Sequence, residues 1–130
     1  MPKRIVVVAA VIEQDGRFLV ARRLASTHLA GYWEFPGGKV HEGESQEDAL
    51  CREIAEELNT SIANTRRIFQ TEHAYPERIV ELHFHRGELT GEPQPMLGQE
   101  LRWITREEFD ALAFPPADAE LIDGLINASL

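Results

Sequence analysis

The stretch Gly38–Thr60, GKVHEGESQEDALCREIAEELNT, decides how this chain of 130 residues folds. It joins a glycine-containing loop to the segment 46–58, which holds no Gly or Pro and only one β-branched residue, so we predict a helix there. Ser45 is a good N-cap before this segment, and it forms a near capping box with Asp48. Asn59 tolerates the left-handed backbone that ends many helices, so the predicted helix has a signal at each end.

Two neighbouring faces of this predicted helix differ in their chemistry. Aliphatic residues recur every fourth position and form a stripe that we expect to be buried: Leu50, Ile54 and Leu58. Three carboxylates are related by three- and four-residue spacing and project together: Glu53, Glu56 and Glu57. Like charges so placed cost a helix about 0.2–0.5 kcal/mol per pair, and a cation would reverse that cost. All-oxygen ligands suit a hard ion, so the pattern predicts Mg²⁺ or Mn²⁺.

The spacing of these residues resembles the Nudix box, G-x5-E-x7-R-E-U-x-E-E-x-G-U, in which U is a bulky aliphatic residue. Seven of its nine specified positions match: Gly38, Glu44, Arg52, Glu53, Ile54, Glu56 and Glu57. Asn59 replaces the last Gly, and Thr60 replaces the last aliphatic residue. The resemblance implies an α/β Nudix fold, an α/β/α sandwich with a mixed β-sheet. It also implies metal-dependent hydrolysis of a nucleoside diphosphate linked to another group.

Four short motifs around the box are similar, in the same order, to motifs of the MutT branch of that family. They are RR at 22–23, WEFPGGK at 33–39, YPER at 75–78 and FPPAD at 114–118. That branch sanitises oxidised nucleotides, which implies a Mg²⁺-dependent nucleoside triphosphate pyrophosphohydrolase that acts on 8-oxo-dGTP and releases the monophosphate and pyrophosphate. Close relatives with the same layout act on cytidine nucleotides, so a (deoxy)CTP pyrophosphohydrolase is the alternative. A non-catalytic nucleotide-sensing Nudix domain is a third hypothesis, which the intact box disfavours.

The resemblance implies a role for each matching residue. The metal would be held by Gly37, Glu53, Glu56 and Glu57. Glu53 is either a ligand or the general base that activates water, Glu44 assists it, and Arg52 orients the carboxylates through charge-assisted bonds. The substrate would contact Arg23, His28, Phe35, Gly38, Lys39, Tyr75, Arg78 and Asp118. A surface-loop role for His28 and core packing for Phe35 and Tyr75 are the alternatives.

One position departs from the MutT pattern. That branch has a metal-binding Glu on a loop six residues before the Trp of the late strand, and this chain has Leu97 there. Glu100 lies three residues further on, and we predict that it takes over as the loop ligand. Without it, the metal would keep an extra water.

Asp118 stands where an Asn of the MutT branch could both accept from and donate to 8-oxoguanine. An ionised Asp only accepts hydrogen bonds. Burial could keep it protonated, so that it mimics the amide. It could otherwise read a donor edge, such as the N4 amino group of cytosine. A third interpretation makes it only the N-cap of the final helix, and this can coexist with base reading.

Length and composition bound the remaining possibilities. A chain of 130 residues with 43% apolar residues and mixed charge indicates one globular domain, residues 1–130. The longest apolar run is too short to cross a membrane, and a single cysteine fits a reducing cytoplasm. The net charge of −9 argues against a nucleic acid polymer as partner. This charge does not argue against a nucleoside triphosphate as substrate. We expect the protein to be a monomer or a homodimer.

Periodicity and turn signals predict an alternating order of strands and helices. The predicted strands are 4–13, 17–23, 33–35, 66–74, 79–89 and 100–104, with a hairpin turn at Asp15-Gly16. A capping box at Thr105–Glu108 predicts a short helix over 106–112, and helical spacing of leucine and isoleucine predicts another over 117–128.

Overall fold

The computed structural model describes residues 2–25 and 29–130. The strands are β1 Lys3–Gln14, β2 Arg17–Arg22, β3 Trp33–Glu34, β4 Gly37–Lys39, β5 Ile62–Tyr75, β6 Arg78–Leu89 and β7 Leu101–Ile104. The helices are α1 Gln46–Leu58 and α2 Ala119–Ile126, with two 3-10 helices, η1 Arg106–Ala111 and η2 Pro116–Asp118. No described helix is long and apolar enough to cross a membrane.

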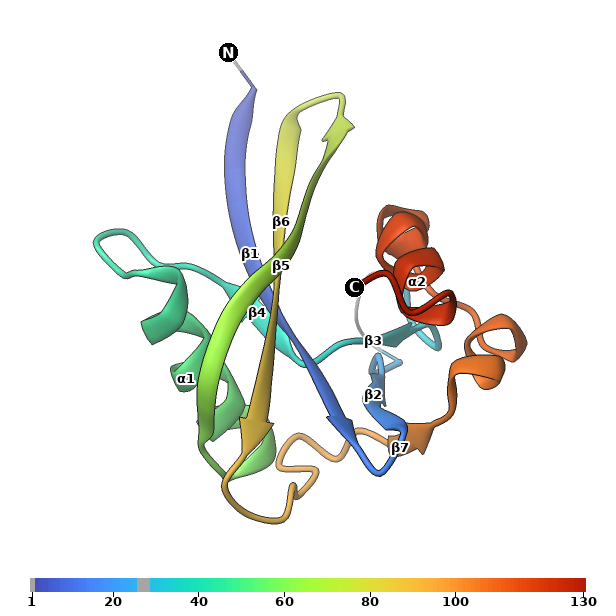
Figure 1. Ribbon diagram of the computed structural model, residues 1–130. Helices are drawn as coiled ribbons and strands as arrows, with labels where there is room; N and C mark the ends of the chain where they lie inside the picture. The colour runs from blue at the N-terminus through green and yellow to red at the C-terminus, as the bar shows by residue number, and fades with distance from the viewer. Residues whose placement is uncertain (1, 26–28) are drawn as a thin grey trace.

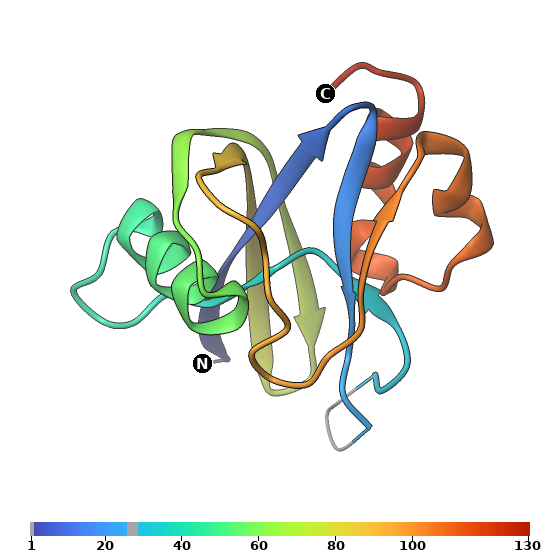
Figure 2. The same cartoon turned by 90° about the horizontal axis from the view of Figure 1, so that it is seen from below.

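The strands form a mixed sheet in the order β3-β2-β1-β6-β5, with β4 paired to β1 and β7 paired to β2. β1 and β6 run parallel and all other pairs are antiparallel. β1 and β2 are joined by the predicted turn, in which Asp15 and Gly16 both have a positive φ, 52° and 76°. Figures 1 and 2 show α1 on one side of the strands and α2 on the other, which confirms the predicted α/β sandwich.

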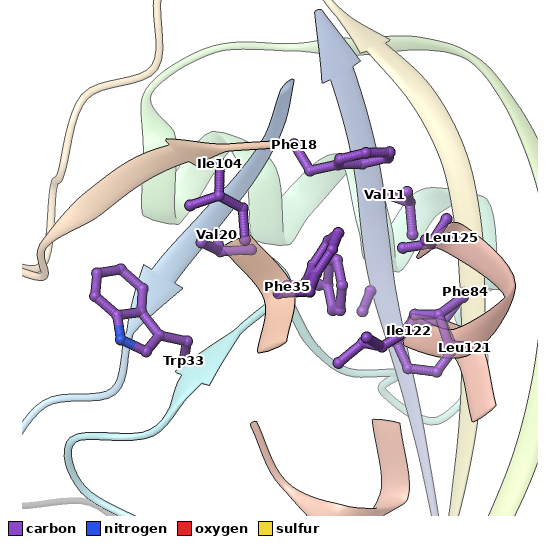
Figure 3. Packing of buried hydrophobic residues seen from close by; sticks show 12 residues of the cluster. Val11, Phe18, Val20, Trp33, Phe35, Phe84, Ile104, Leu121, Ile122 and Leu125 are labelled. Carbon is purple, nitrogen blue, oxygen red and sulfur yellow. The ribbon is translucent and has the colours of Figure 1, made fainter. Parts of the chain in front are cut away.

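β1 is apolar at almost every central position because both of its faces are covered. Val8, Ala10 and Ile12 pack toward α1, in one core with Leu50 and Ile54. Ala9 and Val11, the intervening residues of β1, pack toward α2 in a second core rich in phenylalanine. Other members of this core are Phe18, Phe35, Phe84, Phe109, Leu121 and Leu125. Figure 3 shows part of it, with Phe18, Phe35 and Phe84 labelled. The sheet therefore separates two hydrophobic cores, and loops between them can carry polar groups inward.

α1 has the predicted bounds and the predicted caps. The Asp48 N–H donates to the Ser45 side-chain oxygen at 3.1 Å, which satisfies one of the free donors of the first turn. Asn59 adopts the left-handed conformation with φ 53°, and its N–H donates to the Ala55 carbonyl. The stripe Leu50, Ile54 and Leu58 is fully buried, whereas Cys51 is exposed.

Other elements differ from the predictions at their ends. β5 begins at Ile62, earlier than the predicted residue 66, because a bulge with Asn64 in the left-handed region (φ 55°) interrupts the strand alternation. The capping box of Thr105 and Glu108 is present, but it starts a 3-10 helix that ends at Ala111. α2 begins only at Ala119, after the 3-10 turn that follows Pro115.

Candidate active site

The two glycines of β4 lie where an added side chain would collide with neighbouring atoms. β4 pairs antiparallel with β1, with Val8 opposite Gly38 and Ala9 opposite Gly37. A Cβ at Gly37 would overlap the Val8 carbonyl oxygen, and a Cβ at Gly38 would overlap the carboxyl group of Glu53. The missing side chains therefore allow α1 to bring its acidic face against the backbone of β4.

Arg52 organises the carboxylates around it. Its guanidinium donates to both oxygens of Glu44 at 2.9 and 3.0 Å, to Glu53 at 2.8 Å and to Glu56 at 3.4 Å. It also donates to the Lys39 carbonyl at 2.9 Å, which ties α1 to β4. The hydrogen bonds from Arg52 lower the pKa of Glu44 to about 2, so this carboxylate stays ionised. The orienting role predicted for Arg52 matches this arrangement.

Glu57 lies deeper in the site and has a strongly altered acidity. Burial is the largest cause that raises the pKa of its carboxyl group well above the usual range. A hydrogen bond with Glu53 and the charges of Glu53 and Glu34 raise it further, and the Gly37 N–H opposes the shift. Carboxyl oxygens are thus crowded together at the end of α1 nearest β4.

This donor set fits a hard divalent cation. Two carboxyl groups, Glu53 and Glu57, meet beside backbone groups of β4, and a bound cation would relieve their mutual repulsion. Within residues 2–25 and 29–130, no three His, Cys, Asp or Glu side chains already converge as a complete metal site. The reason is visible at Glu56, which is 57% exposed and turned toward Arg52.

A cavity of about 360 Å³ extends from β4 to the start of α2. Its lining includes most of the residues predicted to bind substrate: Arg23, Phe35, Gly38, Lys39, Tyr75 and Asp118. The Arg78 guanidinium lies over the Tyr75 ring, 5.3 Å from its centroid, in a cation–π contact beside this cavity. His28 lies outside the described residues. Side chains far apart in sequence are therefore brought together around one hollow.

Asp118 is a buried acid at the α2 end of this cavity. Its exposed fraction is 8%, and burial, with a smaller effect of Glu34, raises its pKa to about 7. Asp118 occupies the N-cap position of α2, but its side chain makes no capping hydrogen bond. The interpretation of Asp118 as a helix cap is therefore wrong, because the 3-10 turn before α2 places its carboxyl group in the cavity instead.

Sequence reasoning missed two polar residues of the cavity, Glu34 and His73. The Arg23 guanidinium donates to Glu34 at 2.7 Å, and burial raises the Glu34 pKa against the opposing effect of Arg23. His73 lines the cavity, and its ring packs against Tyr75 with centroids 4.7 Å apart. The sequence contained a signal for each residue. Glu34 lies inside the WEFPGGK motif, and His73 is two residues before Tyr75 on a strand, so both side chains point to the same face.

The predicted loop ligand, Glu100, forms an ion pair with an arginine of β2. Glu100 is half exposed, and its carboxylate lies 3.7 Å from the Arg22 guanidinium. A second, smaller cavity of about 100 Å³ adjoins Glu57, and Leu97 and Gln99 of the same loop line it. Glu100 is not among its lining residues.

Comparison with known proteins gives a consistent picture. The model of the NUDIX domain family matches residues 7–124. The chain is 39% identical to the 8-oxo-dGTP diphosphatase of Haemophilus influenzae, over 98% of this chain and 96% of that protein. It is 41% identical to the CTP pyrophosphohydrolase of Escherichia coli, over 95% of this chain and 93% of that protein.

Solved structures agree with this assignment. The solution structure of the E. coli ORF135 protein superposes with a TM-score of 0.86 at 38% identity, covering 97% of this chain and 91% of that one. The MutT NUDIX hydrolase of Burkholderia pseudomallei superposes with a TM-score of 0.83 at 26% identity, covering 93% and 97%. The Nudix box on α1, the glycines of β4 and the family model that matches residues 7–124 all agree. The chain therefore belongs to the Nudix hydrolase family, enzymes that act on nucleotides with a divalent metal ion.

Proposed function

We propose that this enzyme is a Mg²⁺-dependent nucleoside triphosphate pyrophosphohydrolase whose substrate is 8-oxo-dGTP. The main observation in support is the cavity that runs from Gly38 of β4, which the Glu53 carboxyl group adjoins, to the buried carboxyl group of Asp118. A nucleotide has the matching polarity, with anionic phosphates at one end and a hydrogen-bonding base at the other. The naming of the H. influenzae relative as an 8-oxo-dGTP diphosphatase supports the same proposal.

The proposed metal ligands are Gly37, Glu53, Glu56 and Glu57. A bound Mg²⁺, or Mn²⁺ in its place, would neutralise phosphate oxygens and lower the pKa of a coordinated water. Glu53 accepts the proton of the attacking water, because its carboxylate is pinned by Arg52 on one oxygen and stands against Gly38. Glu44 assists by holding Arg52 in place.

The remaining residues bind and orient the nucleotide. Arg23 contacts phosphate or base, and Lys39, which is exposed at the end of β4, contacts phosphate. Phe35 and Tyr75 border the base, and Arg78 stacks on Tyr75 at its edge. His28, the remaining residue of the predicted set, lies outside the described residues.

A neutral Asp118 supports recognition of the oxidised base. A protonated carboxyl group can accept from N7–H of 8-oxoguanine and donate to O6, as an amide does. The raised pKa of Asp118, about 7, makes this form abundant at and below neutral pH. The ionised form supports the second candidate, because it can accept from the N4 amino group of cytosine. The similarity to the E. coli CTP pyrophosphohydrolase favours this candidate as well.

A turnover screen over 8-oxo-dGTP, dGTP, dCTP and CTP, with and without Mg²⁺, tests the proposal. Pyrophosphate release only with Mg²⁺ is expected, and its absence under all conditions would favour a nucleotide-sensing domain. The ratio of kcat/KM for 8-oxo-dGTP to that for dCTP should fall as pH rises through about 7. Asp118→Asn should hold the ratio constant. A wild type that prefers dCTP or CTP at every pH would establish the second candidate.

Glu100 remains the proposed loop ligand. To reach the metal its carboxylate must leave Arg22, which it faces at 3.7 Å. Glu100→Ala should then weaken Mn²⁺ binding, measured by calorimetry without nucleotide. Unchanged binding would show that the loop supplies no carboxylate.

A further inference from the structure

The loop between β6 and β7 donates hydrogen bonds to the carbonyl groups of the last turn of α1. The Gln94 N–H donates to the Leu58 carbonyl at 2.9 Å, and the Met96 N–H donates to the Glu57 carbonyl at 3.1 Å. The side-chain amide of Gln99 donates to the same Glu57 carbonyl at 3.2 Å. The last carbonyls of a helix have no partner within the helix. The loop therefore supplies the donors that this helix end lacks.

Gln99 connects both sides of this junction. Only 7% of the residue is exposed, and both ends of its amide are used. Its Nε2 donates to the Glu57 carbonyl, and its Oε1 accepts from the Leu97 N–H at 2.9 Å. A buried amide satisfied at both ends holds a fixed position, because leaving either partner unpaired is costly. Gln99 also lines the small cavity beside Glu57.

We propose that Gln99 is a positioning residue for the cation site and acts through the backbone of Glu57. The inference rests on the proposed role of Glu57 as a metal ligand. Glu57 lies one residue from the end of α1, where helices fray. The Glu57 carboxyl group keeps its direction only while that last turn stays helical. Gln99 helps to hold the turn by donating a hydrogen bond to the Glu57 carbonyl oxygen.

Leu97 joins this junction through its backbone. Leu97 occupies the place where a loop carboxylate was expected, and it is 54% exposed. Its N–H, not its side chain, takes part in the junction, by donating to Gln99. This loop thus contributes to the site by positioning Glu57.

The test compares Gln99→Met with Gln94→Ala. Methionine has the length of glutamine but makes neither hydrogen bond, so it removes the side-chain bond to the Glu57 carbonyl with little change in volume, and the backbone bond from Met96 remains. Gln94→Ala is the matched control, because it removes the side-chain bond to Asn59 at 3.2 Å but keeps the backbone bond to Leu58. Mn²⁺ affinity is measured by calorimetry without nucleotide, and unfolding is followed in EDTA.

Gln99→Met should weaken Mn²⁺ binding by about 10- to 100-fold, the usual effect of removing a residue that orients a metal ligand. The Mg²⁺ concentration for half activity should rise by a similar factor, while kcat at saturating Mg²⁺ changes little. Gln94→Ala should bind Mn²⁺ as the wild type does. Gln99→Leu provides a second variant should Gln99→Met fail to fold.

Mn²⁺ affinity in a folded Gln99→Met that equals the wild-type value would overturn the inference, even with a lower melting temperature, because the role would then be structural only. Equal losses of Mn²⁺ affinity in Gln99→Met and Gln94→Ala would also overturn the inference, because any damage to the junction would then weaken metal binding. A wild type that binds no Mn²⁺ would instead remove the proposed metal site itself, and with it the role of Gln99.

Discussion

At the scale of single residues, Glu53 is a carboxylate that three neighbours hold in place. Arg52 donates to one of its oxygens at 2.8 Å, Glu57 shares a hydrogen bond with it, and Gly38 lies directly against it. Only 14% of its side chain is exposed. A group fixed from three sides suits a general base, which must meet the attacking water in one geometry.

Glu53→Gln should abolish most activity and leave the fold intact. Glutamine keeps the size of the side chain but cannot accept the proton, so the loss should be about 10²–10⁴-fold in kcat. Pyrophosphate release at saturating Mg²⁺ measures it, and circular dichroism checks the fold. Glu47→Gln, in the exposed first turn of the same helix, is the control and should retain activity. A Glu53→Gln enzyme with nearly full turnover would remove Glu53 from the mechanism.

Gly38→Ala tests the close approach of β4 to α1. The added methyl group would overlap the Glu53 carboxyl group, so this side chain must move. A displacement of about 1 Å at a catalytic group can cost about 10²-fold in rate, and we expect a loss of that order in kcat. Steady-state kinetics with urea unfolding in parallel separate the effect on Glu53 from an effect on folding. Wild-type kinetics would show that Glu53 tolerates the shift.

The acidic face depends on α1 as an element, because Glu53 and Glu57 converge only if the last turns of the helix stay helical. The two ends are held in different ways. A side chain, Ser45, caps the first turn, and the left-handed Asn59 with the loop of Gln99 closes the last turn. Damage at the first end should therefore affect stability, and damage at the last end should affect the metal site.

Ser45→Ala should lower the free energy of unfolding by about 1 kcal/mol, the typical cost of losing an N-cap side chain. Turnover per folded molecule should stay unchanged, since Glu53 and Glu57 lie on later turns. Urea denaturation measures the first effect, and kinetics at saturating Mg²⁺ measure the second. Ser45→Thr keeps the capping oxygen and should resemble the wild type. Equal stability of the Ala and Thr variants would contradict a capping contribution.

At the scale of the whole molecule, two hydrophobic cores lie on opposite sides of the sheet. The cavity needs several elements at once, because β1, β4, β5, β6 and η2 each contribute part of its lining. Asp118 shows the consequence. Its burial comes from η2 packing near β5, and this burial raises its pKa to about 7.

The pH dependence of the free energy of unfolding should reflect the titration of Asp118. The folded chain keeps this proton up to about pH 7, whereas an unfolded Asp releases it near pH 3.9. Between these values the folded state binds more protons, so this contribution to the free energy of unfolding falls as pH rises, by at most about 4 kcal/mol. Asp118→Asn should thus gain stability relative to wild type between pH 4.5 and pH 8 in urea denaturation. A constant difference would show an ordinary Asp118 pKa.

Much of the fold and of the acidic site could be predicted from local sequence. The bounds and caps of α1 and the hairpin turn at Asp15-Gly16 are confirmed. Of the three carboxylates predicted to project together, Glu53 and Glu57 meet, whereas Glu56 is turned toward Arg52. These features depend on residues within about four positions of one another, through backbone preferences and helical spacing. The motif resemblance extended the prediction to the family, which the comparisons confirm.

The tertiary structure decided the properties that depend on burial and on distant partners. Four such properties each join segments that are remote in sequence. They are the raised pKa of Glu57, the close packing of Gly37 in β4 against β1, the orientation of Asp118 into a cavity, and the hydrogen bond from Gln99 to α1. Helical periodicity predicted the buried aliphatic stripe of α1, but the burial of a polar side chain is set by which distant elements pack over it. The sequence by itself therefore determined the helix and its carboxylates, while packing decided how strongly each carboxyl group is desolvated and what it faces.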